Sequence, residues 1–265
     1  MSRELARAAA VILHYGDCRL TRRLHEQLLA EAQAAAMPVL VLDNAAPEPY
    51  AAAWRRLPEN RCWAGAFDFA IQAVREMDCS HLWFLNNDIV FTSRPPHLGR
   101  ALGRLARMEA ALGPVGCFSP AFEASPYHPQ MVARPGGDYR LVRVMDGVAP
   151  LVSLSALDAV GGLDAADNPR GYGVDIWLSV RLHRAGYKLV VDHGLTVRHR
   201  HHTTAREVPG FLEAAARAEA AYLSARLGPD YRERVAVWQG ETVEAEDFSC
   251  RASTKRPDDV SRTKP

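Results

Sequence analysis

The chain has 265 residues, of which 48% are hydrophobic and 24% are charged, and its 32 Lys and Arg residues nearly balance 31 Asp and Glu residues. This composition is typical of a globular protein, and the length allows one large domain or two small ones. A formal net charge of +1 provides no overall field for a polyanion, and the one dense basic run, VRHRHH at 197–202, is short. We therefore expect no nucleic-acid partner.

The cysteines and the apolar runs indicate the compartment. Five cysteines are scattered along the chain without a CxxC pair, which is more typical of reduced thiols than of disulfides or a thiolate metal site. The longest apolar runs, such as AAAVIL at 8–13, are far shorter than the ~20 residues of a membrane-spanning helix. The N-terminus also lacks the features of a signal peptide. We expect a cytoplasmic protein, and peripheral association with the inner face of the membrane stays open.

Hydrophobic patterns in the first 118 residues predict strands that alternate with helices. The expected elements are a strand at 9–15, a helix at 19–36, a strand from 39, a helix at 63–77, a strand at 81–85, a helix at 98–112 and a strand at 114–118. Such alternation predicts an α/β fold with a Rossmann-like, mostly parallel central sheet and helices on both faces. Ligands of such sheets bind at the carboxyl ends of the strands.

A second unit follows a Pro- and Gly-rich segment at 119–140, which is too long for a plain connection and is expected to serve a site. Its expected elements are a strand at 148–154, a short helix ending at Gly161-Gly162, a helix at 174–185 and strands near 187–192 and 195–198. We predict one domain over 1–205, made of a first half at about 1–118 and a second half at about 119–205. A helical extension at 206–240, divided by Pro229, and a disordered tail at 241–265 complete the prediction.

Acidic residues follow two of the predicted strands. Neither a P-loop nor a GxGxxG motif follows the first strand, where HYGDCR stands, so a Rossmann dehydrogenase is not predicted. A divalent cation held by a carboxylate beyond a strand is another way to neutralise a pyrophosphate, and Asp88 in LNND supplies one. Asp43 in VLVLDN has a carboxylate that would accept hydrogen bonds from the edge of a nucleotide base. Both residues are equally compatible with turns or caps.

Seven segments in order carry a resemblance to a known family. They are VILHYGD, VLVLDNAAPE, ENRCWAGAFDFAI, HLWFLNNDIVF, VGGLD, GYGVDIWLSVRLHRAGYKLVV and LTVRH. Over about residues 9–202 the chain resembles the family 2 glycosyltransferases of the GT-A fold, particularly the rhamnosyltransferase-like branch. The resemblance implies a nucleoside-diphosphate-sugar donor, a divalent cation (Mn²⁺ or Mg²⁺), and inversion at the anomeric carbon by direct displacement. The acceptor would be a hydroxyl of a carbohydrate or glycolipid. The half at about 1–118 would then be the nucleotide-binding half, and the half at about 119–205 would be the acceptor-binding half.

The resemblance assigns donor and metal residues. It places Asp43 at the base and His14 and Tyr15 beside the nucleoside. Asn86, Asn87 and Asp88 fall on the family's D-x-D metal motif, in which Asp88 would be the single carboxylate ligand and the two asparagines would lie at the donor. His199 falls where relatives place a histidine near the metal, although a solvated loop with Arg200, His201 and His202 is an equally simple interpretation.

One segment departs from the family pattern N-x-G-x-x-x-A-x-N. Here Cys62 replaces the glycine and Asp68 replaces the last asparagine. The first change alters how closely this loop can approach the nucleotide. Asp68 would face hydroxyls of the donor sugar or have only a structural role.

The family's catalytic base lies in an acidic pair that opens a helix before an A-G-Y sequence. The matching residue is Asp175, 12 residues before Tyr187, with Val174 in place of the first acid of the pair. A carboxylate there would deprotonate the acceptor hydroxyl, although stabilisation of the helix dipole alone also explains it. Gly162 and Asp164, in the G-G-L-D segment that matches the family's G-G-F-D, and Tyr172 would lie at the acceptor.

Two other functions remain compatible with these residues. A degenerate relative that binds nucleotide sugars without turnover would explain Val174 and Cys62. A sugar-1-phosphate nucleotidyltransferase would share the sheet, but its Gly-rich basic loop is missing after the first strand. The sequence leaves open the sugar, the nucleobase, the acceptor, the pathway and the oligomeric state.

Overall fold

A computed structural model describes residues 6–200 and 208–246. In this part of the chain ten strands form one sheet, and β5 joins it only through β9. The strands are β1 (Ala8–His14), β2 (Val39–Asp43), β3 (Arg55–Arg56), β4 (His81–Asn86), β5 (Ile89–Phe91), β6 (Val115–Phe122), β7 (Gly137–Leu141), β8 (Leu151–Ser153), β9 (Lys188–His199) and β10 (Val243–Glu246). The helices are α1 (Cys18–Ala35), α2 (Cys62–Glu76), α3 (Leu98–Leu112), α4 (Leu154–Ala159), α5 (Val174–Arg184), α6 (Phe211–Leu227) and α7 (Tyr231–Gly240), with a 3-10 turn η1 (Pro129–Met131). The predicted α/β class is confirmed.

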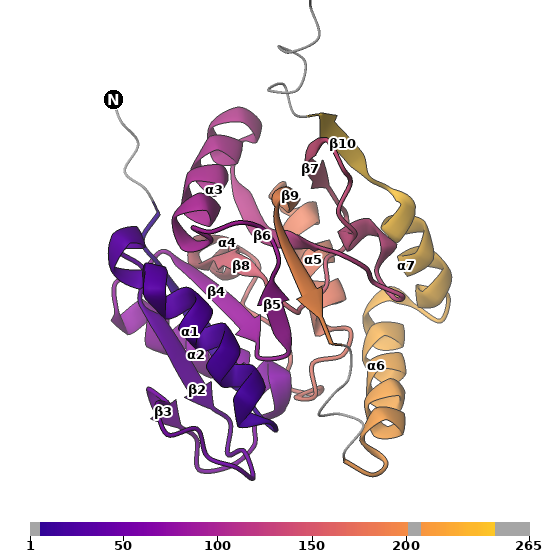
Figure 1. Ribbon diagram of the computed structural model, residues 1–265. Helices are drawn as coiled ribbons and strands as arrows, with labels where there is room; N and C mark the ends of the chain where they lie inside the picture. The colour runs from indigo at the N-terminus through magenta and orange to yellow at the C-terminus, as the bar shows by residue number, and fades with distance from the viewer. Residues whose placement is uncertain (1–5, 201–207, 247–265) are drawn as a thin grey trace, which may run out of the picture.

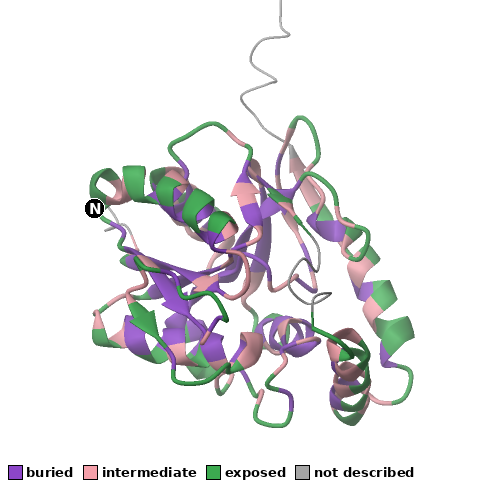
Figure 2. Cartoon of the chain, turned by 60° about the horizontal axis from the view of Figure 1, so that its bottom comes forward, coloured by how far each residue is buried: buried purple, intermediate pink, exposed green. Residues whose placement is uncertain are grey.

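The N-terminal half of the sheet is parallel, in the order β3-β2-β1-β4. The apolar stripe of α1, which includes Leu24 and Leu28, is fully buried against this sheet. Helices lie on both sides of the sheet, whose strands are buried between them (Figure 1, Figure 2). Because His14 pairs with Asp43 and Leu13 pairs with Asn86, the carboxyl ends of β1, β2 and β4 meet at one edge.

The C-terminal half of the sheet is mixed. Strand β8 is antiparallel to both β4 and β6, while β6 and β9 are parallel. The two strands predicted near 187–192 and 195–198 form the single strand β9, in which the register against β6 shifts between Pro120 and Ala121. A bulge of this kind lets a strand continue through a short irregularity. The backbone N–H of Gly194 donates to the carboxylate of Asp192 at this point, 3.1 Å away.

The segment predicted to be a disordered tail, 241–265, includes a strand of the sheet near its start. Strand β10, which lies in the segment expected to be disordered from 241, pairs antiparallel with β7. The disordered tail is therefore wrong for 243–246, because backbone hydrogen bonds to β7 and the ion pair between Arg140 and Glu244 hold this segment. The remainder of the predicted tail, from 247, lies outside the described residues.

The helical extension is present as two helices, α6 and α7, which end and begin on either side of Pro229. Both lie beside the C-terminal half of the sheet (Figure 1). Within the described residues, no helix combines the length and the apolar character that a membrane crossing requires.

Candidate active site

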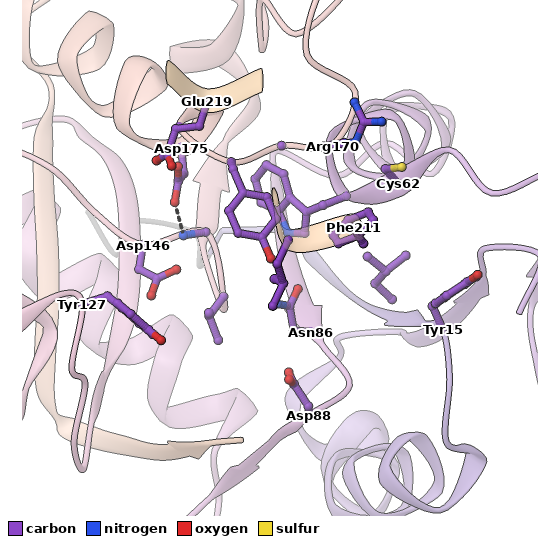
Figure 3. Close-up of a pocket in the computed structure, with 18 of the residues that line it drawn as sticks. Tyr15, Cys62, Asn86, Asp88, Tyr127, Asp146, Arg170, Asp175, Phe211 and Glu219 are labelled. Atoms are coloured by element: carbon purple, nitrogen blue, oxygen red, sulfur yellow. Dashed lines mark hydrogen bonds between the residues drawn. The ribbon is translucent and has the colours of Figure 1, made fainter. Parts of the chain in front are cut away.

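A cavity of about 710 Å³ opens beyond the carboxyl ends of β1 and β4. It gathers residues that are far apart in the chain, and Figure 3 shows several of them around one space. Of the predicted site residues, those in its lining are Tyr15, Asn86, Asn87, Asp88, Tyr172, Asp175 and His199. Asp88 and Asp175 therefore line one and the same cavity.

Two asparagines form one end of this cavity. The Nδ2 of Asn44 donates to the Oδ1 of Asn60 at 2.9 Å, and the backbone N–H of Arg61 donates to the Oδ1 of Asn44, also at 2.9 Å. These bonds fix the turn before α2. Cys62 follows with a φ of 53°, in the left-handed region where glycine is favoured, and it lines the cavity. A glycine would adopt this backbone conformation without strain, whereas the Cβ of Cys62 makes it unfavourable.

Two predicted donor residues are buried structural groups. Asp43 is fully buried, and its carboxylate accepts hydrogen bonds from the N–H groups of Ala46 and Tyr50 and from Arg56 at 2.6 Å. It stabilises the loop after β2 and is not in the cavity lining, where the next residue, Asn44, appears instead.

His14 is likewise fully buried and outside the lining. Its ring nitrogens contact the Thr21 hydroxyl at 2.6 Å and the Glu48 carbonyl at 2.9 Å. Asp68 lies on the exposed surface of α2, away from the cavity. The structure therefore favours a structural role for His14, and it places Asp68 outside the cavity lining.

The predicted metal residues lie together. The Nε2 of His199, at the end of β9, is 3.3 Å from the Oδ1 of Asp88, and the two side chains are 9% and 12% exposed. Burial opposes the charged form of His199, but hydrogen bonding to Asp88 and its negative charge outweigh burial and raise the histidine pKa. The backbone N–H of Arg200 also donates to the Asp88 carbonyl at 3.0 Å. His201 and His202 lie outside the described residues.

These residues fit a divalent cation that shares its coordination with a ligand. Within 6–200 and 208–246, no three His, Cys, Asp or Glu side chains lie together as a complete metal cage. The Oδ1 of Asn86, however, is buried at the cavity and has no hydrogen-bond partner among the described residues. A carboxylate, an imidazole and an amide oxygen form a donor set that suits Mn²⁺, with the remaining positions left to phosphate and water.

Asp175 is held firmly at the start of α5. Its Oδ2 accepts the Gly147 backbone N–H and its Oδ1 accepts the Ile176 backbone N–H, each at 2.9 Å (Figure 3 shows the first bond). Val174, beside it, is fully buried in the core and supplies no second carboxylate at this position.

The surroundings of Asp175 favour its protonated form. Removal from solvent and then the negative charge of Asp146 raise its pKa to about 7, against the opposing effects of His128 and the two backbone hydrogen bonds. The helix N-terminus would by itself lower this pKa. A carboxyl group that titrates near neutrality is matched to general base catalysis.

Only one of the three predicted acceptor residues lines the cavity. Tyr172 lines the cavity, and burial followed by the surrounding carboxylates raises its pKa to about 12. Gly162 caps α4 with a φ of 79°, its N–H donating to Leu157, and it is outside the lining. The exposed Asp164 is also outside, because its carboxylate binds Trp177 and Arg226.

Several lining residues were not predicted. They are Asn44, Asn60, Tyr127, His128, Asp146, Arg170, Phe211 and Glu219. The long segment 119–140 does serve the cavity, through Tyr127 and His128. The Asp-Gly turn before β8 was a weak sequence indication that Asp146 belongs to a site. Glu219 lies in an Ala-rich helix without any pattern that distinguishes it.

No protein-family model matches the chain. The uncharacterized proteins Rv1525 and MT1576 of Mycobacterium tuberculosis and Mb1552 of Mycobacterium bovis are 29% identical over 178 residues, which are 65% of this chain and 67% of theirs. Among solved structures, GalNAc-T7 with UDP, GalNAc and Mn²⁺ has a TM-score of 0.55 at 11% identity and covers 75% of this chain.

The chain spans less than half, 44%, of that GalNAc-T7 chain. The mannosyltransferase PcManGT from Pyrobaculum calidifontis, in complex with GDP-Man and Mn²⁺, has a TM-score of 0.52 at 13% identity, over 94% of this chain and 78% of its own. At this identity a likeness establishes the fold. The strand order, the helices on both faces and these two likenesses show that the chain has the GT-A glycosyltransferase fold.

Proposed function

We propose that the protein is a metal-dependent, inverting glycosyltransferase that moves a sugar from a nucleoside diphosphate to a hydroxyl of a carbohydrate or glycolipid acceptor. The observation that carries the proposal is that Asp88 and Asp175 line the same cavity at the carboxyl ends of the strands. The finer assignment, to family 2 and its rhamnosyltransferase-like branch, rests on the order of the seven sequence segments.

The donor would bind along the edge formed by β1 and β4. Tyr15, Asn44 and Asn60 line this end of the cavity and would lie beside the nucleoside. Asn87 is fixed near them by its Nδ2, which donates to Thr21 at 2.9 Å. Asp88 and His199, with the Oδ1 of Asn86, would hold a divalent cation. When bound, such an ion offsets the negative charge of the departing nucleoside diphosphate. The Mn²⁺ in both solved neighbours agrees with this donor set.

Asp175 would remove the proton from the acceptor hydroxyl as that oxygen attacks the anomeric carbon. Its two backbone hydrogen bonds fix the direction of the carboxylate, which reduces the reorganisation needed during the reaction. Its raised pKa makes the carboxylate a stronger base than an exposed aspartate. Attack from the face opposite the leaving group would invert the configuration.

A thermal-shift experiment tests the donor half of the proposal. UDP-GalNAc, GDP-mannose and a TDP-sugar, each with and without Mn²⁺, should raise the melting temperature of the protein only when the correct nucleotide and the cation are both present, because ligands of the folded state stabilise it. Absence of Mn²⁺-dependent stabilisation by every nucleotide sugar would contradict the proposal.

Turnover distinguishes an enzyme from a degenerate binding protein. Wild-type protein that binds a donor should release its nucleoside diphosphate, by transfer to a sugar acceptor or slowly to water, and Asp175→Asn should bind the donor within a few fold but lose transfer. Donor binding without any release by the wild type would favour a nucleotide-sugar-binding protein instead.

A further inference from the structure

The C-terminal helix α6 forms one wall of the cavity. Leu212, Ala216 and Glu219 are spaced at i, i+4 and i+7, so they share one face of the helix, and with Phe211 they line the cavity. Glu219 is half-buried, and Figure 3 shows its side chain next to Asp175. The helical extension therefore supplies a carboxylate beside the proposed base.

The following turns of the same face of α6 are anchored to the turn that precedes the base. Arg226 pairs with Asp164 and Asp167, each at 3.0 Å, and the Tyr222 hydroxyl donates to the Asp164 carbonyl at 2.8 Å.

Glu219 itself packs against this turn. A Cβ on Gly173, the residue that caps α5, would lie 3.2 Å from the Cγ of Glu219 and 3.0 Å from Leu223. Close packing thus sets the position of Glu219 relative to Asp175. The contacts of Asp164 with Tyr222 and Arg226 hold α6, and with it this wall of the cavity, in place.

Three carboxylates surround the space at this end of the cavity. Asp146, Asp175 and Glu219 all line the cavity here, and ionised carboxylates accept hydrogen bonds but donate none. The basic lining residues are His128, which lies 3.7 Å from Asp146, Arg170 and, beside Asp88, His199. Arg232 acts on Glu219 from outside the lining. Burial raises the pKa of Glu219. A ligand that suits this surface offers donors and brings no further negative charge.

Resting on the proposed transferase function, we propose that α6 is the wall of the acceptor subsite, where Glu219 accepts a hydrogen bond from a hydroxyl of an uncharged sugar and disfavours acceptors that carry a carboxylate. Glu219 is then a specificity-determining residue. The class of acceptor is a neutral polyhydroxylated sugar rather than a uronic acid.

The test uses matched pairs of sugars on the full chain, loaded with Mn²⁺ and the nucleotide that stabilises it. The probes are methyl glucoside and methyl galactoside against methyl glucuronide and methyl galacturonide, with binding measured by saturation-transfer NMR and titration calorimetry. We expect at least one neutral glycoside to bind ten times more tightly than its uronide. Glu219→Gln should reduce this ratio at least fivefold, because it removes the charge and keeps the shape.

Glu213→Gln is the matched control, since Glu213 is exposed on the same helix outside the cavity lining. It should leave the ratio unchanged, and both variants should melt near the wild-type temperature. Wild-type protein that binds the uronides as well as the glycosides, or binds neither glycoside, would overturn the inference. So would an unchanged ratio in Glu219→Gln or an equal change in Glu213→Gln.

Nucleotide binding, measured on the same samples, distinguishes a failure of the proposed transferase function from a failure of the proposed role of α6. If the wild type binds no nucleotide with Mn²⁺, the proposed function fails and the acceptor subsite fails with it. If nucleotide binding is present and the sugar ratio does not respond to Glu219→Gln, only the role of α6 is refuted.

Discussion

Replacement of Asp175 by asparagine should abolish transfer and at the same time stabilise the protein at alkaline pH. In the folded protein the pKa of this carboxyl is raised from 3.8 to about 7, first by burial and then by the charge of Asp146. Between these two values the folded state holds a proton that the unfolded chain has lost. Because the unfolded state binds fewer protons, stability falls as the pH rises through this window, and the full cost is present above pH 7.

The magnitude follows from the shift. At 1.36 kcal/mol for each pH unit, ionised Asp175 costs the folded state roughly 4 kcal/mol as an upper limit. Asparagine cannot be ionised, but its amide nitrogen cannot accept one of the two hydrogen bonds from Gly147 and Ile176, a loss of about 1 kcal/mol. A net gain of roughly 2–3 kcal/mol at pH 8 corresponds to a rise of roughly 5–10 °C in melting temperature.

Calorimetric melting at pH 5 and pH 8 measures the effect. The variant should melt well above the wild type at pH 8 and close to it at pH 5, where both side chains are neutral. Asp68→Asn, an exposed substitution on α2, is the control and should show no such pH dependence. If Asp175→Asn gains no more stability at pH 8 than at pH 5, the raised pKa and the general-base argument built on it are both refuted.

Three further outcomes are expected. The kcat/KM of the wild type should fall about tenfold for each pH unit below about 7, as Asp175 becomes protonated, and a flat profile from pH 5 to 8 would contradict this. Asp88→Ala should weaken Mn²⁺-dependent nucleotide binding at least tenfold in titration calorimetry, and unchanged affinity would remove this residue from the metal site. Asp43→Ala should lower the free energy of unfolding in urea by about 3 kcal/mol, chiefly because it leaves two buried N–H groups without an acceptor, while the partly exposed Arg56 stays solvated and donor affinity stays within a few fold. A specific loss of donor affinity would instead support base binding by Asp43.

Much of the fold follows from local patterns in the sequence. The helix expected at 98–112 coincides with α3, and the strand expected at 81–85 is β4 with one more residue. These patterns are informative because each element buries one face, and the period of the buried positions identifies the type of element. Errors arise where distant pairing decides: β10 is a strand because β7 offers it a partner, and β9 is continuous because β6 supports it across a bulge.

The site was predictable where it depends on the ends of parallel strands. Asn86, Asn87 and Asp88 follow β4 and reach the cavity because every parallel strand of this half ends at the same edge. Asp43 follows a strand in the same way, but it is turned into the loop after β2, where Arg56 and two N–H groups bind it. No sequence pattern distinguishes a carboxylate that faces a ligand from one that accepts hydrogen bonds from its own loop.

The sequence by itself determined the α/β architecture, the edge at which a ligand would bind, and the candidacy of Asp88, Asp175 and His199. Only the tertiary structure decided which carboxylates share a space, since Asp146 and Glu219 reach Asp175 from a distant turn and from the last third of the chain. The physical reason is the distance along the chain over which each effect acts. Periodicity and turn chemistry act over a few residues, whereas burial and charge, which set the pKa of Asp175, depend on every segment that packs around it.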